Sequence, residues 1–269
     1  MKNQMKNIHQ ETKRVIKYQW IPDTPDHRDI PFSLPLKNIT LPTHVNIIGI
    51  RNKIEQQYNL GSCTGCSATS ALEIAIGTKR PFSKLMAYYT AREQRGTVSE
   101  DSGASIRNVM KGLLTTGVAY EETHPYNVYQ YATTPSIKAY AEAKALVDRM
   151  WGYEYVRLYT LVDIKSALSA GFPVTFGFSV PEWFLSPNFN NIIRFPSSRE
   201  KLIGGHAVVA VGYDDRYQDK IIWVRNSWSK DWGIKGYFKM TQDWFTNPAR
   251  LADDFWVIRR NLNAVKPIT

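Results

Sequence analysis

The amino-acid sequence predicts an α+β fold with two lobes, one helical and one built from strands, that face each other across a cleft. Up to about residue 125, apolar residues recur at the three- and four-residue spacing of helices. After about residue 150 they gather in short runs rich in β-branched and aromatic side chains, which is typical of strands. A helical half followed by a strand-rich half indicates two packed units, and the contact between such units is a usual place for a binding cleft.

The first helix is expected to follow Ser62, a good N-cap residue, and to end before Gly77 and Pro81. Between these limits a single apolar face is formed by Ala68, Ala71, Leu72, Ala75 and Ile76. Helical spacing returns over 84–92 and 105–114, and one later helix is expected over 163–170. Strands are expected over 155–159, 174–180, 206–213, 221–225, 236–240 and 255–258, with a long surface loop over 181–196.

The net charge of +10 raises the possibility of nucleic-acid binding, but its distribution argues against it. Residues 1–20 contribute +4 (five basic, one acidic) and residues 257–269 contribute +3, so seven of the ten charges lie at the two ends. This pattern is typical of solvated tails and differs from a basic stripe interleaved with aromatic side chains. No nucleic-acid partner is therefore expected.

Hydropathy and cysteine usage indicate the compartment, and we expect a monomer that needs reducing conditions. No run approaches the 18 consecutive apolar residues of a membrane span, and residues 1–20 have no apolar signal-peptide core. Two cysteines only three positions apart provide no disulfide framework of the secreted type. We expect a cytoplasmic protein, or one released without the general secretory signal.

One stretch carries both cysteines of the chain, Cys63 and Cys66, at the start of the first expected helix. A thiol in the first turn of a helix lies at the positive end of the helix dipole, which favours the reactive thiolate. Gln57, six residues before Cys63, can bring a side-chain N–H donor beside the sulfur. An activated thiol beside an amide donor is what acyl transfer through a thioester requires.

The stretch from Gln57 to Cys66 resembles the nucleophile motif of the papain-like cysteine peptidases, Gln-Gly-x-Cys-Gly-Ser-Cys-Trp. With Cys63 as the nucleophile, Gln57 keeps the glutamine position of that motif. With Cys66 as the nucleophile, Leu60 would stand there, and its side chain has no donor for an oxyanion. We therefore place the nucleophile at Cys63, where Leu60 replaces the first cysteine of the motif and Thr64 its tryptophan.

Two later motifs complete the resemblance. His206 begins an apolar strand, and an imidazole there can take the thiol proton and later give it to a leaving amine. Asn226, in the run Asn-Ser-Trp, can accept the other ring N–H, and Trp228 can cover that hydrogen bond. The order glutamine, cysteine, histidine, asparagine and the 143 residues from Cys63 to His206 (206 − 63) are those of the family.

The resemblance also implies a set of residues on the substrate side of the site. Gly103 and Ala104 occupy the positions where the family binds the substrate backbone as an additional strand, although Gly103 could equally be a helix-start glycine. Gly205 leaves room beside His206, and Trp228 is placed with this set as well.

The activity implied is that of a cysteine peptidase acting on a peptide or protein, without a cofactor. An amidase or transamidase using the same residues remains an alternative, as does a catalytically silent binding protein. A thiol–disulfide oxidoreductase using Cys63 and Cys66 is a further alternative, but the residues before Cys63 are polar, whereas a redox motif follows an apolar strand. No metal is expected, because two cysteines and His206 do not complete a four-ligand set.

The domain organisation follows from these assignments. We expect a basic tail over 1–19, one papain-like catalytic domain over 20–260 and a C-terminal tail over 261–269. Within the domain, the helical lobe is expected over about 45–125, and the β-rich lobe, antiparallel and barrel-like, over about 126–260 together with a proline-rich N-terminal strap. The long inhibitory prosegment usual in the family does not fit before residue 20, so latency is expected to come from elsewhere or to be unnecessary.

Overall fold

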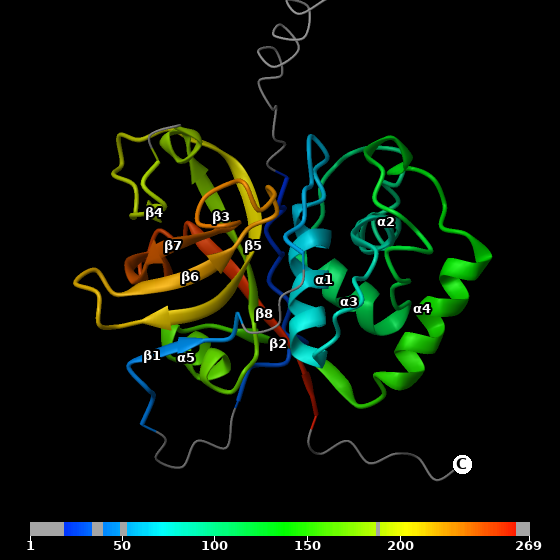
Figure 1. Cartoon of the computed structure of the whole chain (residues 1–269), viewed down its shortest axis with the longest axis horizontal. Helices are drawn as coiled ribbons and strands as arrows, with labels where there is room; N and C mark the ends of the chain where they lie inside the picture. Colours follow the sequence, from blue (N-terminus) through cyan, green and yellow to red (C-terminus); the bar gives the residue numbers. More distant parts are fainter. Residues whose placement is uncertain (1–18, 34–39, 49–52, 187–188, 262–269) are drawn as a thin grey trace, which may run out of the picture.

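The computed structural model describes residues 19–33, 40–48, 53–186 and 189–261. They form two lobes side by side, with the helices α1 to α4 in one lobe and most of the strands in the other (Figure 1). The predicted α+β two-lobe fold is therefore confirmed. No helix among the described residues is long and apolar enough to cross a membrane.

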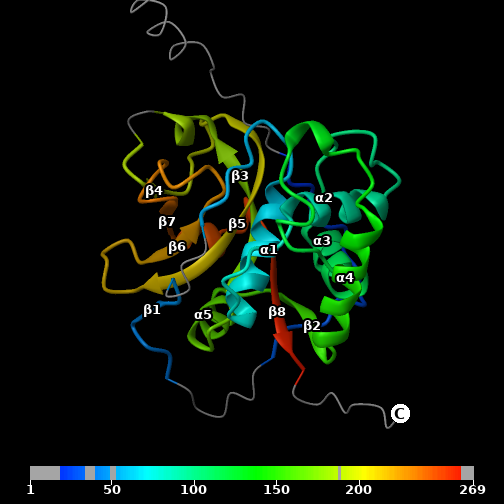
Figure 2. The ribbon, with the colours of Figure 1, turned by 45° about the vertical axis from the view of Figure 1, so that its right-hand side comes forward.

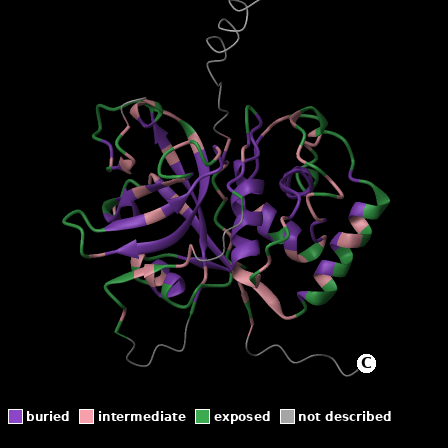
Figure 3. Cartoon of the chain, in the orientation of Figure 1, coloured by how far each residue is buried: buried purple, intermediate pink, exposed green. Residues whose placement is uncertain are grey.

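The helical lobe contains the three helices predicted for it and one that the sequence analysis missed. They are α1 (Cys63–Ile76), α2 (Lys84–Glu93), α3 (Ile106–Thr115) and the unpredicted α4 (Ile137–Arg149). Helix α4 buries few side chains, and Figure 3 shows its outer side exposed, so it has only a narrow apolar stripe. The sequence does contain a signal for its start, since Pro135 is followed by Ser136, a good N-cap residue. In the structure Ser136 accepts a hydrogen bond from Ala139 N.

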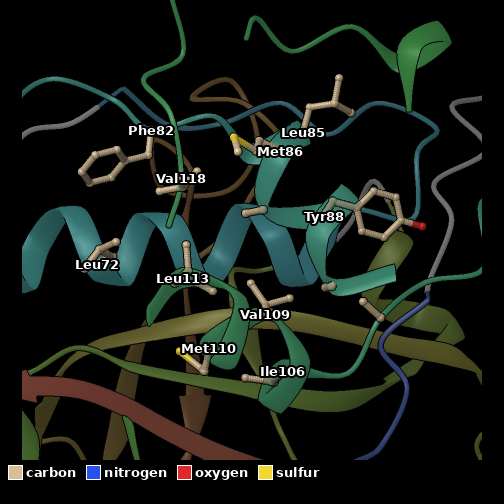
Figure 4. Packing of buried hydrophobic residues seen from close by; sticks show 14 of the residues in the cluster. Leu72, Phe82, Leu85, Met86, Tyr88, Ile106, Val109, Met110, Leu113 and Val118 are labelled. Carbon is tan, nitrogen blue, oxygen red and sulfur yellow. The ribbon is translucent and has the colours of Figure 1, made fainter. Parts of the chain in front are cut away.

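Helix α1 is the central element of the molecule. Residues 63–74 are buried on every side, because α2 and α3 pack on one face and the sheet on the other. Figure 4 shows α1, which carries Leu72, between side chains of α2 such as Leu85 and side chains of α3 such as Leu113 and Val109. Gly77 ends the helix in the left-handed conformation, as predicted. Ser62 is the N-cap residue, but its hydroxyl does not cap the helix.

The strands of the second half lie close to their predicted positions. They are β2 (Tyr153–Leu158), β3 (Val174–Pro181), β4 (Ile192–Ile193), β5 (Leu202–Asp214), β6 (Ile221–Arg225), β7 (Tyr237–Thr241) and β8 (Ala252–Arg260), with β1 (His44–Asn46) added from the N-terminal part. The one predicted helix of this half is α5 (Leu161–Ser169). The predicted loop over 181–196 contains a short 3₁₀ helix, Glu182–Leu185, as well as β4.

The sheet is open and mixed, which corrects the predicted antiparallel barrel-like lobe. Its order is β2-β8-β3-β5-β6-β7-β4, and β1 pairs with β5 outside this path. Strand β4 runs parallel to β7, while the other pairs are antiparallel. The long strand β5 makes up the centre of the sheet and also contacts α1, so it joins the two lobes.

The boundary between the lobes lies later in the chain than predicted. The sequence places the β-rich lobe from 126 onward, but Ala139, Ala143 and Leu146 of α4 belong to the core of the helical lobe. The helical lobe therefore extends to about residue 150. The predicted tails lie outside the described residues, except for Gln19 at one end and Asn261 at the other.

The N-terminal strap, residues 19–33, runs between the two lobes, as Figures 1 and 2 show in dark blue. Trp20 N donates to Gly205 O at 2.9 Å, and Ile21 N donates to Ala104 O at 3.1 Å. Further along, Phe32 N donates to Arg157 O at 2.7 Å. The strap is therefore hydrogen-bonded to the β-rich lobe on one side and to the helical lobe on the other.

The docking of α4 can be tested with a pair of glycines that both have positive φ. A Cβ on Gly117 (φ +82°) would collide with the backbone of Ala143 in α4, whereas a Cβ on Gly96 (φ +69°) would meet no atom within 4 Å. Gly96→Ala should cost about 1–2 kcal/mol of unfolding free energy, because only the left-handed backbone is strained. Gly117→Ala should cost more, because α4 must shift. Urea unfolding measures both, and equal losses would contradict this packing.

Candidate active site

The catalytic candidates come from both lobes and meet where α1 packs on β5. Cys63 is the first residue of α1, and its thiol is fully buried. The sulfur is surrounded by backbone N–H groups, among them those of Ala207 from β5, Gln19 from the strap and Thr64. Cys63 is therefore placed beside the strand that carries His206.

His206 and Asn226 form the predicted pair. The ring nitrogen Nε2 of His206 lies 2.7 Å from Oδ1 of Asn226. The same oxygen accepts the backbone N–H of Ser227 at 2.9 Å, which fixes the orientation of the amide. Because a carbonyl oxygen only accepts, Nε2 carries the proton in the neutral ring, and Nδ1 is the basic nitrogen.

Trp228 covers this pair, as predicted from its place after Asn226. Its ring stacks on the imidazole of His206, with centroids 4.8 Å apart and an interplanar angle of 24°. Phe178 packs edge-on against the same imidazole, with centroids 5.9 Å apart. Since Trp228 is itself 3% exposed, it shields the histidine from water, and its assignment to the substrate side stays a prediction.

Gln57 is held with its side-chain amide in a defined orientation. Its Oε1 accepts from the hydroxyl of Ser227 at 2.6 Å, so its Nε2 must point the other way, where it donates to Leu60 O at 3.2 Å. Tyr126 adds a second support, since its hydroxyl donates to Gln57 O at 3.0 Å. An amide nitrogen has two N–H groups, so one remains for an oxyanion beside Cys63.

The substrate-side residues surround the strap. Gly205 and Ala104 use their carbonyl groups to accept from Trp20 and Ile21, as described above. A Cβ on Gly103 (φ +73°) would collide with the backbone of Gln19, so this position requires glycine. The three residues predicted to bind a substrate strand thus contact a strand that belongs to the chain itself.

Burial changes the electrostatics of the catalytic pair. Loss of solvent raises the pKa of the Cys63 thiol to about 11, although the surrounding backbone N–H groups oppose the rise. Burial also lowers the pKa of His206 to about 4, against the effect of the Asn226 hydrogen bond. The thiolate predicted from the helix dipole is therefore not the favoured form while the strap is docked, because desolvation outweighs the dipole.

Cys66 occupies a different environment, one helical turn further into the protein. It is 1% exposed, its sulfur lies 3.9 Å from the hydroxyl of Ser62, and burial raises its pKa strongly. Both cysteines are free thiols. Cys66 also lines a small cavity with Glu55 and Arg225, two side chains that form an ion pair at 3.1 Å. These surroundings suit a structural thiol and support Cys63 as the nucleophile.

The strap is anchored by a network that the sequence analysis did not detect. Arg107 of α3 donates to both carboxylate oxygens of Asp29, at 2.8 and 2.5 Å. Arg157 of β2 donates to Asp29 at 3.2 Å and to Asp254 of β8 at 2.7 Å. Asp23 accepts from the indole of Trp256 at 2.8 Å. A signal was present in the aspartates of the proline-rich strap, but their partners lie up to 233 residues away in the sequence.

Comparison with known proteins agrees with this geometry. Residues 42–253 match the family model described as papain family cysteine protease. The chain belongs to the papain family of cysteine proteases. A peptidase C1-like protein of Acanthamoeba polyphaga mimivirus is 37% identical over 235 residues, which cover 83% of this chain and 72% of that protein. A cathepsin B-like protein of Giardia intestinalis is 29% identical over 198 residues, which cover 70% of this chain and 64% of that one.

Solved structures of the papain family support the same fold. Xylellain, a cysteine protease from Xylella fastidiosa, has a TM-score of 0.83 and 32% sequence identity over 93% of this chain and 98% of its own. Bromelain from Ananas comosus, in complex with the E64 inhibitor, has a TM-score of 0.59 and 20% identity over 82% of this chain and 100% of its own, which is a likeness of fold alone. The chain is thus a papain-like hydrolase of the cysteine peptidase class.

The burial of Cys63 predicts a slow and pH-dependent reaction with iodoacetamide. With the strap docked, the thiolate becomes populated only as the pH rises toward about 11, so labelling at neutral pH should be slow. The full-length variant Trp20→Ala weakens the strap, and its labelling rate should rise about tenfold for each unit by which the thiol pKa falls. A peptide map resolves Cys63 from the internal control, Cys66, which should stay unlabelled. Equal rates and identical pH profiles would contradict the shielding.

Proposed function

We propose that the chain is a latent cysteine peptidase that hydrolyses peptide bonds in extended segments through a thioester on Cys63. The observation that carries the assignment is the His206–Asn226 hydrogen bond beside a cysteine at the first turn of α1. In this arrangement Asn226 fixes the ring, and His206 Nδ1 exchanges a proton with the thiol. Gln57 is oriented to supply one of the two oxyanion donors.

The reaction proceeds in two acyl transfers. The Cys63 thiolate attacks the substrate carbonyl, and the resulting oxyanion accepts from Gln57 Nε2 and from the backbone N–H of Cys63. His206 then gives its proton to the leaving nitrogen, and the C–N bond breaks to leave a thioester. In the second half, His206 takes a proton from water, whose oxygen displaces the sulfur and releases the carboxylic acid.

A peptide is favoured over a small amide because the site offers main-chain acceptors on both sides. The carbonyl groups of Gly205 and Ala104 accept backbone N–H groups from two consecutive strap residues, Trp20 and Ile21. An extended substrate can use the same acceptors as an added strand. A small amide substrate would leave most of them without a donor.

The strap makes the enzyme latent by filling this strand position. The backbone N–H of Gln19 lies beside the sulfur of Cys63, so the strap occupies the space that a substrate carbonyl group would need. Activity requires residues 19–23 to leave the site.

Removal of the catalytic groups should reduce turnover in a defined order. Cys63→Ala should abolish cleavage of a denatured general protein substrate, and His206→Ala should be nearly as severe. Gln57→Ala should lower kcat by about 10²–10³-fold, the usual effect of one lost oxyanion donor. Asn226→Ala should be milder than His206→Ala, because an orienting residue does not exchange the proton. Cys66→Ala is the matched control, and a loss of turnover there with retention in Cys63→Ala would reverse the assignment.

Loosening the strap should raise activity without touching the catalytic groups. Trp20 is 8% exposed and donates hydrogen bonds to Gly205 and Asp254 of the β-rich lobe, so Trp20→Ala should increase the initial rate of cleavage by the full-length chain. Ile30, at 48% exposed, lies on the same strap away from the site, and Ile30→Ala should leave the rate unchanged. If both variants cleave at the parent rate while Cys63 stays essential, the strap is not the latency element.

A further inference from the structure

We propose that Asp254 is a specificity-determining residue that selects tryptophan as the second substrate residue before the scissile bond. The proposal rests on the peptidase function proposed above and concerns the pocket that Trp20 occupies. The strap residue serves as the internal model of a substrate side chain, since it lies in the strand position that a substrate must use.

The pocket is shaped for a flat ring. The indole of Trp20 lies against Gly177 of β3 and Gly205 of β5, where an added Cβ would collide with ring atoms in each case. Gly177 is paired with Ala207 on one side and with Asp253 on the other, so its neighbours in the sheet are short. These positions leave a slot wide enough for an indole and bounded by backbone.

The end of the pocket carries a hydrogen-bond acceptor. Oδ2 of Asp254 accepts the indole N–H of Trp20 at 3.1 Å and the backbone N–H of Asp23 at 2.8 Å. Oδ1 is held by Arg157 at 2.7 Å, and the side chain of Asp254 is 2% exposed. When the strap leaves, Oδ2 loses both of its donors. A substrate side chain that fills the slot displaces water from Oδ2 and buries it again, so a side chain that brings an N–H is favoured over one of equal size without it.

The number of backbone bonds shows which substrate residue corresponds to Trp20 of the strap. In the strap, the backbone N–H of Gln19 lies beside the sulfur of Cys63, and four bonds separate that nitrogen from the Cα of Trp20. In a substrate the atom at the sulfur is the carbonyl carbon of the residue before the scissile bond. Four bonds from that carbon, in the N-terminal direction, lead to the Cα of the preceding residue. The pocket therefore takes the second residue before the cleaved bond.

The charges around the pocket favour a neutral donor over a cation. Arg157 of β2 pairs with Asp253 and Asp254, and Arg250 pairs with Asp253. Arg107 of α3 pairs with Asp29 of the strap, which also contributes Asp23. Departure of the strap removes the latter two carboxylates and leaves three guanidinium groups with two carboxylates. Arginine or lysine would enter a positively charged surrounding, whereas tryptophan brings its N–H without a charge.

Release of the strap also favours the ionised form of Asp254. Burial raises its pKa to about 7 while Asp23 lies beside it. Because the carboxylate of Asp23 leaves with the strap, one cause of this rise is removed, and Arg157 continues to favour the charged form. At pH 8 the oxygen facing the opened pocket is an acceptor.

The test compares three substrates with the full-length Trp20→Ala chain at pH 8. Fluorogenic peptides carry tryptophan, 1-methyltryptophan or 2-naphthylalanine at the second position before the scissile bond, followed by glycine. Tryptophan should give a kcat/KM about tenfold to a hundredfold higher than the other two, which fill the slot but have no N–H. An arginine peptide should be poorer than the tryptophan peptide. Equal values for tryptophan and naphthylalanine, or a preference for arginine, would overturn the proposal.

A matched pair of variants in the same background assigns the effect to Asp254. In Asp254→Asn the amide oxygen must stay on Arg157, so a nitrogen donor faces the pocket and the preference for tryptophan over 1-methyltryptophan should disappear. Asp253→Asn removes a neighbouring charge that does not contact Trp20 and should keep the preference. An unchanged preference in Asp254→Asn would refute the role of this residue.

The outcomes also separate this proposal from the peptidase function. Cleavage of a denatured general protein substrate without selection for tryptophan refutes the pocket assignment alone. Absence of cleavage together with absence of Cys63 labelling by an epoxysuccinyl inhibitor refutes both. Since the substrate series uses one enzyme form, its result does not depend on whether the Asp254 variant folds.

Discussion

The packing of α1 against β5 is the interaction on which the rest of the structure depends. Cys63 stands at the start of α1, and His206 stands on β5, so neither lobe alone contains the catalytic pair. Because α1 is buried on all sides, close packing fixes the position of its first residue, Cys63. The hydrogen bonds of Gln57 and Asn226 then orient the groups around that contact.

Desolvation is the second constraint. It keeps the catalytic groups of the folded site in their uncharged forms, which are not the reactive ones. The same burial that orders the imidazole, with Trp228 stacked on its face, also favours the uncharged forms of Cys63 and His206 when the strap is docked. The charged forms, a thiolate on Cys63 and an imidazolium on His206, become more favourable once water reaches the sulfur. In the latency proposed for this chain, one segment controls both access and ionisation, without any change in the catalytic residues themselves.

The anchors of the strap lie away from the chemistry. Arg107 and Arg157, from different lobes, share the carboxylate of Asp29, and Asp254 holds the strap through Asp23 and Trp20. Buried charges of this kind are costly when one partner is removed. Docking of the strap is therefore coupled to the pocket that lies beneath Trp20, and release of the strap exposes the acceptor oxygen of Asp254 in the pocket proposed for a substrate side chain.

The sequence by itself determined the chemical groups, because each catalytic role follows from a residue type in a short local motif: a cysteine at a helix start, a histidine on an apolar strand and an asparagine before a tryptophan. It also determined the helices and strands with strong periodicity. Helix α4 was not predicted, because its buried stripe is narrow. Only the tertiary structure decided the open sheet, the covering of Cys63 and the pocket of Trp20. These features depend on contacts between residues such as Trp20, Gly177 and Asp254, which are separated by more than 70 positions and leave no local pattern.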